Sequence, residues 1–337
     1  MSLPDLWFTA IAALWAGYLF LEGFVFGAGV LTRALARDAA ERRLLIGTVA
    51  PVWAGNEGWL LAACAATAAA FPAWAAALAG AFAVPLPAIL AALVLRAAAF
   101  ACRDRRDGER WRRGWDVCVF FGSLAPAFLW GVIFGNVVRG VELDAAHRYT
   151  GGFWALLNVP ALAGGLTTLL LFLFQGAVFA ALRTSGGVRE RARAMAGTLG
   201  GGAITVTAVA LLWTQAARGS AWTAATAAVA AAALLAAAAL VRAGGRDGAA
   251  FAAAGTCVAA ATITLFASLY PVLLPAVPNP ADGLTVAGAA APHPALVAMT
   301  WTAAVALPAV LLYQARTCRA FRRRVAPVAP VAPVTPG

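Results

Sequence analysis

The chain has 337 residues, of which 63% are hydrophobic and 12% are charged, and its formal net charge is +11. A water-soluble domain of this size carries about a quarter of its residues as charged side chains, whereas here the apolar residues form runs of about twenty, the length of a membrane-crossing helix. These features exclude a soluble globular protein. They also argue against a nucleic-acid partner, because the basic residues lie in short loops between apolar runs.

Nine apolar segments follow one another along the chain and predict an all-α, polytopic membrane protein with about nine transmembrane helices. They lie near residues 7–31, 50–71, 80–101, 115–137, 158–182, 197–217, 221–241, 250–274 and 295–315. The first is interpreted as a retained span, because no basic region of a cleavable signal peptide precedes it. After Arg324 the sequence repeats Val-Ala-Pro, which predicts an extended, disordered Pro/Ala-rich tail over residues 325–337.

The arginines divide unequally between the two sides that these segments define. One side receives 21 of the 25, and the other receives Arg139, Arg148 and Arg218, while Arg96 lies inside a span. Because loops rich in arginine stay in the cytoplasm, we expect the N-terminus outside and the C-terminus in the cytoplasm. An odd number of spans satisfies this arrangement.

A short internal echo suggests how the helices are grouped. Leu21–Phe26 recurs 153 residues later as Phe174–Phe179, in segments that would cross in the same direction. Two parallel four-helix units are one explanation, and chance similarity between apolar helices is the other. The first explanation divides a transmembrane domain at 1–324 into a bundle at 7–137, a bundle at 158–274 and a ninth helix at 295–315.

Glycines spaced four residues apart mark two places where helix backbones are expected to approach closely. The pairs are Gly23 with Gly27 and Gly131 with Gly135. Ordinary helix packing accounts for both.

Ionisable side chains at membrane depth are expensive, which makes them functional candidates. Glu22, Glu57, Arg96 and Asp116 all fall towards the arginine-rich side of their segments, and Asn56 stands beside them. Two interpretations stay open. Arg96 pairs with Glu22 or Glu57 while Asp116 meets the interface, or the carboxylates form a hydrated entry for protons.

The sequence offers no obvious place to hold a redox cofactor. Haem iron needs axial ligands inside the bundle, but the only histidines, His147 and His293, fall in predicted outer loops. The five cysteines are scattered, and no nucleotide-binding, zinc-protease or serine-hydrolase motif is present. We therefore expect this chain to have no metal, cofactor or catalytic centre of its own.

Several strings, in order along the chain, resemble those of one known family. Residues 21–29 read Leu-Glu-Gly-Phe-Val-Phe-Gly-Ala-Gly, residues 51–59 read Pro-Val-Trp-Ala-Gly-Asn-Glu-Gly-Trp, and residues 111–116 contain Trp-Arg followed by Trp-Asp. Gly135-Asn136 and Gln175-Gly176 extend the likeness, as does the C-terminal stretch with Phe321-Arg322. Together these strings resemble subunit II of the cytochrome bd-type quinol oxidases.

This resemblance implies a heterodimer in the bacterial cytoplasmic membrane, in which quinol is oxidised and oxygen is reduced to water. It implies that haem b and haem d lie on a partner, subunit I, and that this chain binds no haem. In some members the second subunit also lines a proton route from the cytoplasm. A small single-span subunit and membrane lipid are further candidate partners.

Departures from the family pattern fall where that proton route would begin. Val25, Ala54 and Ala101 stand where the family commonly has acidic residues, whereas Glu22 and Glu57 persist. The chain therefore looks like a divergent member that scaffolds subunit I, in which either Glu22 and Glu57 substitute for the missing acids or protons enter only through the partner.

Two alternatives belong to other classes of protein. A stand-alone transporter would have helices broken near the midplane; Pro126 and Pro308 keep it open, and the other prolines near span ends count against it. A purely structural or assembly subunit would have no proton path at all.

Overall fold

The computed structural model describes residues 2–106 and 108–320, and most of these residues are helical. The predicted tail at 325–337 lies outside the described residues. In chain order the elements are α1 (Leu3–Leu35), α2 (Ala39–Ala70), α3 (Pro72–Ala81), α4 (Pro85–Cys102), η1 (Arg103–Arg105), α5 (Glu109–Arg139), β1 (Val141–Glu142), η2 (Phe153–Leu156), α6 (Val159–Arg183), α7 (Gly186–Arg218), α8 (Ala221–Ala243), α9 (Asp247–Leu269), β2 (Val272–Leu274), β3 (Ala276–Val277), η3 (Pro280–Asp282), β4 (Leu284–Thr285), α10 (Val286–Ala289) and α11 (His293–Ala320).

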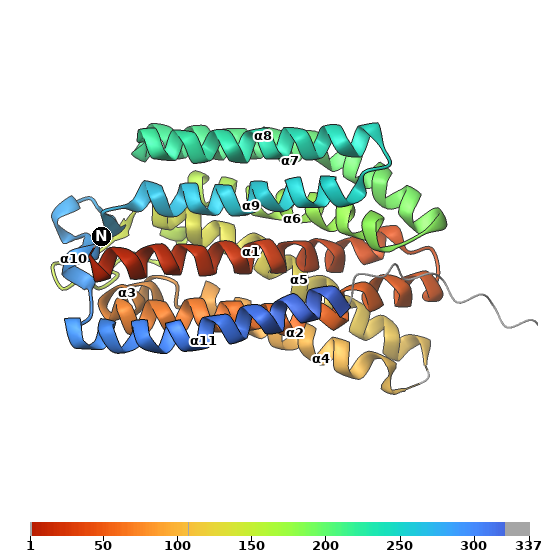
Figure 1. The fold of residues 1–337 in the computed structure, drawn as a ribbon, viewed down its shortest axis with the longest axis horizontal. Coiled ribbons are helices and arrows are strands. Elements are labelled where there is room, and N and C mark those ends of the chain that lie inside the picture. Colours follow the sequence, from red (N-terminus) through yellow and green to blue (C-terminus); the bar gives the residue numbers. More distant parts are fainter. Residues whose placement is uncertain (1, 107, 321–337) are drawn as a thin grey trace, which may run out of the picture.

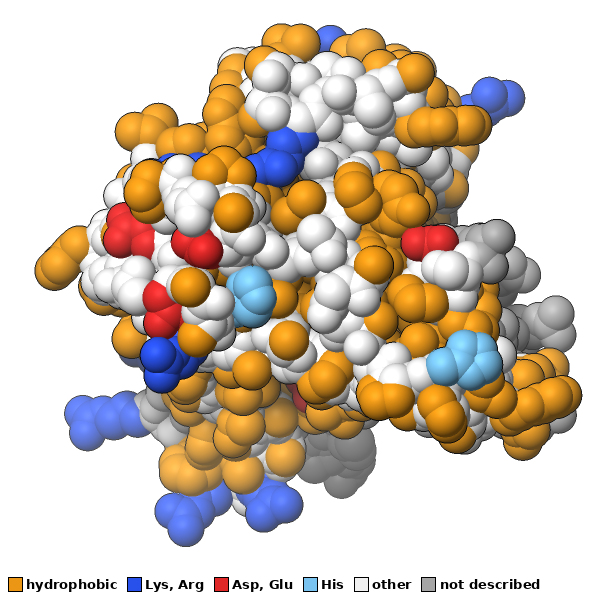
Figure 2. Space-filling view, turned by 90° about the vertical axis from the view of Figure 1, so that its left-hand side faces the viewer, with side chains coloured by type: hydrophobic (Ala, Val, Ile, Leu, Met, Phe, Trp, Pro, Cys, Tyr) orange, Lys and Arg blue, Asp and Glu red, His pale blue; other side chains and the backbone are white. Residues whose placement is uncertain are grey.

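The long helices lie side by side, and their connections gather at two ends (Figure 1). The turns after α1, α4, α6 and α8 share one end, which we call the arginine-rich end because it holds most of the described arginines. The N-terminus, α10 and the short strands lie at the opposite end. Figure 2 views that opposite end, whose surface is largely hydrophobic (orange) with scattered charged side chains. The unequal division of arginine expected from the sequence is therefore present in the fold.

Each of the nine predicted segments coincides with a helix, but the number nine is not confirmed. In the part of the chain that the structure describes, seven helices are long and apolar enough to cross a membrane, or up to eight when the bent pair of α2 and α3 counts as one span. That bend, between Gly55–Ala70 and Pro72–Ala81, measures 118°. It falls where Pro72 disfavours helical backbone at the residue before it.

Two predicted boundaries were wrong. The segment expected at 250–274 is helical only to Leu269, because Pro271 disfavours the helical conformation at Tyr270 and the chain turns into β2. The segment expected from residue 80 becomes α4 only at Pro85, which occupies the first helical position, where a missing N–H costs nothing. At the other end, β2 pairs with β4 in antiparallel fashion, while β1 pairs with β3 in parallel.

Local side chains explain where several helices begin. Ser2 and Asp5 form a reciprocal capping box at the start of α1, and Asp38 accepts a hydrogen bond from the backbone N–H of Glu41 at the start of α2. Asn158 caps α6 through the backbone N–H of Ala161. These contacts satisfy backbone donors that a helix leaves unpaired in its first turn.

Glycine allows the central helices to touch through their backbones. A Cβ atom at Gly27 of α1 would collide with the carbonyl group of Phe172 on α6, where Gly176 is also close. A Cβ atom at Gly131 of α5 would likewise collide with Gly164 of α6. The close approach predicted from the two glycine pairs is confirmed, and it is the usual device of helices that pack in lipid.

The contacts between helices place α1 at the centre of the molecule. It packs against α2, α5, α6 and α9. The helix α4 packs on α5, α7 packs on α6, and α8 packs on α9. The helix α11 lies along α2 (Figure 1). The division into bundles at 7–137 and 158–274, with a ninth helix at 295–315, stays a prediction.

Candidate functional site

Three of the predicted charged residues meet in one cluster, built from α1, α2 and α4. Arg96 Nη2 lies 2.6 Å from Glu22 Oε1 and 3.4 Å from Glu57 Oε1. The side chains of Arg96 and Glu22 are 0% exposed, whereas that of Glu57 is 28% exposed. Arg96 therefore pairs with both candidate partners. The cluster extends from the buried Glu22 to the partly exposed Glu57.

The walls of this cluster fix the arginine in place. Gly122 of α5 lies directly against Arg96, and a Cβ atom at position 122 would meet both the Arg96 Cβ and the Ala92 carbonyl oxygen at 2.8 Å. The Phe26 ring lies 4.6 Å from the Arg96 guanidinium carbon, a cation–π contact that suits a desolvated arginine. One helical turn before Glu22, Tyr18 accepts a hydrogen bond of 3.2 Å from Trp130 Nε1.

Two amide side chains hold the backbone of α1 beside Glu22. Asn56 Nδ2 donates to the Leu21 carbonyl at 2.9 Å, and Gln175 Nε2 donates to the Phe20 carbonyl at 3.1 Å. Both residues are buried. Asn56, predicted to belong to the cluster, therefore acts on the helix that carries Glu22 rather than on a charge.

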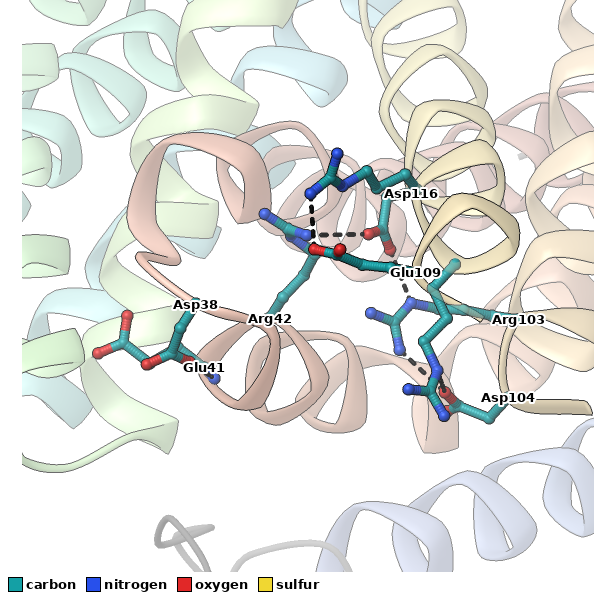
Figure 3. Close-up of polar contacts among 9 residues, drawn as sticks. Asp38, Glu41, Arg42, Arg103, Asp104, Glu109 and Asp116 are labelled. Carbon is teal, nitrogen blue, oxygen red and sulfur yellow. Dashed lines mark hydrogen bonds and ion pairs between the residues drawn. The ribbon is translucent and has the colours of Figure 1, made fainter. Parts of the chain in front are cut away.

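Asp116, the fifth predicted residue, lies outside this cluster. Its carboxylate is 2.6 Å from Arg103 Nε and 3.3 Å from Arg42 Nη1, at the arginine-rich end (Figure 3). Arg103, which is 2% exposed, also lies 3.0 Å from Asp104. Asp116 thus fastens α5 to α2 and to the turn after α4, and makes no ion pair with Arg96.

Another ion pair at the arginine-rich end joins α7 to α2. Arg191 Nη2 of α7 lies 2.6 Å from Glu41 Oε2 of α2, and the Arg37 backbone N–H donates to the same carboxylate at 2.7 Å. The Arg191 hydrogen bond, followed by that of Arg37, holds the pKa of Glu41 below its usual range.

The cluster carries two acids for one base, and part of its hydrogen-bonding capacity is unused. Glu22 Oε2 and Arg96 Nε and Nη1 are buried without a partner among the described residues. Buried polar atoms of this kind are normally satisfied by a partner or by water. Chemically, the arrangement can hold and pass protons, but it offers no nucleophile and no metal-binding set.

The histidines do not fit a haem. His147 lies in the loop after β1, with its Nδ1 2.7 Å from the Asp282 carbonyl, and His293 is exposed at the start of α11. Both are outside the helical core of the part of the chain that the structure describes. A haem bound between two histidines of this chain is incompatible with these positions.

Sequence reasoning missed two residues that shape the site. Gln175 occupies the position of the internal echo that corresponds to Glu22, and this correspondence was the available signal. Arg103 is one of six arginines between residues 103 and 113, and nothing in the sequence distinguishes the buried one from the exposed ones.

Comparison with known proteins identifies the family. The family model described as cytochrome bd terminal oxidase subunit II matches residues 3–321. Cytochrome bd ubiquinol oxidase subunit 2 from Bacillus subtilis is 37% identical over 330 residues, covering 96% of this chain and 97% of the relative. Cytochrome bd-I ubiquinol oxidase subunit 2 from Escherichia coli is 30% identical over 347 residues, covering 92% of each chain.

A solved structure shares the fold. A chain in the structure of bd oxidase from Geobacillus thermodenitrificans superposes with a TM-score of 0.77 and 20% sequence identity, covering 95% of this chain and 97% of that one. The fold, the ordered sequence strings and the near-complete match to the family model agree. The chain belongs to the cytochrome bd terminal oxidase subunit II family.

Proposed function

We propose that this chain is the non-haem second subunit of a quinol:oxygen oxidoreductase and that it scaffolds a haem-bearing subunit I in a bacterial cytoplasmic membrane. The observation that carries the proposal is the family match over residues 3–321. The scarcity of histidine inside the bundle supports it, because haem b and haem d then belong on the partner, where quinol is oxidised. A small single-span subunit is a further candidate partner.

The division of arginine supports an orientation. If the arginine-rich end faces the cytoplasm, the N-terminus lies outside and the C-terminus lies inside. Glu22, Glu57 and Arg96 then lie towards the cytoplasmic half of the membrane, and Asp116 lies near its surface.

We also propose that the cluster of Glu22, Glu57 and Arg96 contributes to proton uptake from the cytoplasm, with Asn56 as a positioning residue. The partly exposed Glu57 is suited to receive a proton and the fully buried Glu22 to hold one, because Arg96 bridges the two carboxylates. Asp116 would keep the entrance open by tying α5 to α2. Val25 and Ala101 stand apolar in this region, so Glu22 and Glu57 take the place of the missing acids.

The experiment uses the assembled complex and measures oxygen uptake, proton uptake and the haem d absorption band. Glu22→Gln and Glu57→Gln are expected to slow both uptake rates while leaving the haem spectrum unchanged. Glu190→Gln is the matched control, because Glu190 is exposed on α7, far along the chain from the cluster. Unchanged rates in both cluster variants would instead assign the chain a purely structural or assembly role.

Removing the chain altogether tests the scaffold itself. Deletion should abolish the haem d spectrum and oxygen uptake, and a haem-bearing partner should purify with the intact chain. A chain that purifies alone, and whose deletion changes neither measurement, would contradict the proposal. A stand-alone transporter is not favoured, because α5 continues through Pro126 as one helix and the relatives are oxidase subunits.

A further inference from the structure

A cavity of about 240 Å³ opens between α1, α2 and α5 at the arginine-rich end, apart from the Glu22 cluster. Arg33, Arg42 and Arg113 line it from three different helices. Ile46, Val117 and Phe120 supply its apolar wall. The cavity thus combines a charged rim with a hydrocarbon-like wall.

The rim has an excess of positive charge. Asp116 is the one acidic residue that lines the cavity, and its carboxylate is already held by Arg42 and by Arg103 (Figure 3). Among the residues that the structure describes, Arg33 has no carboxylate within ion-pair distance. Arg113 pairs with Glu109, and both of those side chains are well exposed, so this pair holds the Arg113 guanidinium weakly.

The wall of the cavity continues onto the outer surface of α5. Val117 is 43% exposed, and one helical turn further along α5 Phe121 is 55% exposed. In a chain that crosses a membrane, such side chains contact hydrocarbon or an apolar partner. The apolar wall of the cavity is therefore continuous with an exposed apolar surface of α5.

We propose that this cavity binds the headgroup of an anionic phospholipid. The guanidinium groups of Arg33, Arg42 and Arg113 bind the phosphate oxygens, and an acyl chain lies along Val117 and Phe120. Arginine is suited to phosphate because its planar donors match the geometry of the phosphate oxygens. Basic pockets between membrane helices are a recognised form of lipid site. The apolar wall favours a lipid over free phosphate, which would leave it uncovered.

The test measures lipid binding to the purified, delipidated complex by native mass spectrometry, so its result does not depend on oxidase activity. The probes are phosphatidylglycerol, phosphatidylcholine and inorganic phosphate, each added back separately. Arg33→Gln removes one rim charge from an exposed residue, and Val117→Trp fills the mouth of the cavity without changing charge. Arg43→Gln is the control, because Arg43 is exposed on the same helix as Arg42 and does not line the cavity.

Phosphatidylglycerol should bind more tightly than phosphatidylcholine. Arg33→Gln should weaken phosphatidylglycerol binding about fivefold, which is the contribution of one arginine to binding an anionic lipid surface. Val117→Trp should also weaken it, and Arg43→Gln should stay within about twofold of the unmodified complex. Equal binding of the two lipids, or phosphatidylglycerol binding unaffected by Arg33→Gln, would overturn the proposal. Inorganic phosphate that blocks phosphatidylglycerol at equal concentration would show a free-phosphate site and would overturn it as well.

Discussion

Glu22 and Glu57 share one arginine, but their burial differs, and this difference predicts unequal stability effects. Glu22 is 2.6 Å from Arg96 with neither side chain exposed, whereas Glu57 is 3.4 Å away and 28% exposed. Removing one partner of a buried ion pair costs about 3–5 kcal/mol, and a longer contact to a partly exposed carboxylate should cost less. Glu22→Gln should therefore lower the free energy of unfolding by about 3 kcal/mol or more, and Glu57→Gln should lower it by a smaller amount.

The assay is unfolding of the purified complex in mixed micelles by titration with a denaturing detergent, followed by tryptophan fluorescence. A double-mutant cycle of Glu22→Gln with Arg96→Met separates the pair from its surroundings. Arg96→Met alone leaves two carboxylates without a base, whereas the double variant removes most of that imbalance. The two changes should therefore cost less together than the sum of their separate costs, by about 0.5–3 kcal/mol.

Two results would refute this reasoning. Glu57→Gln could prove as costly as Glu22→Gln, which would mean that the partial exposure of Glu57 does not weaken its pairing. The two changes in the cycle could also prove additive, which would mean that Glu22 and Arg96 do not depend on each other.

Three further predictions concern the packing and the ion pairs at the arginine-rich end. Gly27→Leu should prevent correct packing of α1 on α6 and abolish the folded yield, measured by size-exclusion chromatography, while Gly201→Ala, which has nothing within 4 Å of its Cβ position, should leave the yield unchanged. Arg103→Met should lower the free energy of unfolding by about 1.5–3 kcal/mol, because it removes the shorter charged hydrogen bond of a largely buried carboxylate and leaves it only Arg42 at 3.3 Å, whereas Arg113→Gln should change it by less than about 0.5 kcal/mol; equal effects would contradict the burial argument. The pKa of Glu41 is lowered on folding by its arginine partner, so its stabilising contribution is complete above the unfolded value of about 4.5 and is lost as the pH falls through the lower folded value. Unfolding titrations should therefore show Glu41→Gln less stable than the unmodified complex at pH 6, with the difference shrinking below pH 4.5, and a constant difference would disprove the linkage.

The helices and the unequal distribution of arginine between the two ends of the fold could be predicted, because apolar length and arginine position are local properties of the sequence. The pairing of Arg96 could be narrowed to Glu22 or Glu57 from their common depth. The separation of Asp116 could not, because it depends on the buried Arg103, thirteen positions away across a turn. The contact from Gln175 to α1 spans 155 positions, and only the packed fold brings those two segments together. The end of α9 at Leu269 follows from Pro271, which disfavours helical backbone at Tyr270.

The two amide hydrogen bonds on α1 have a consequence for how the chain can vary. The consecutive carbonyl groups of Phe20 and Leu21 accept hydrogen bonds from two different helices, α6 and α2. At Gly27, less than two helical turns further along, the backbones of α1 and α6 are in direct contact. A shift of α6 or α2 would therefore move the carboxylate of Glu22 relative to Arg96. Substitutions in α6 that remove no charged residue should still change the distance between Glu22 and Arg96.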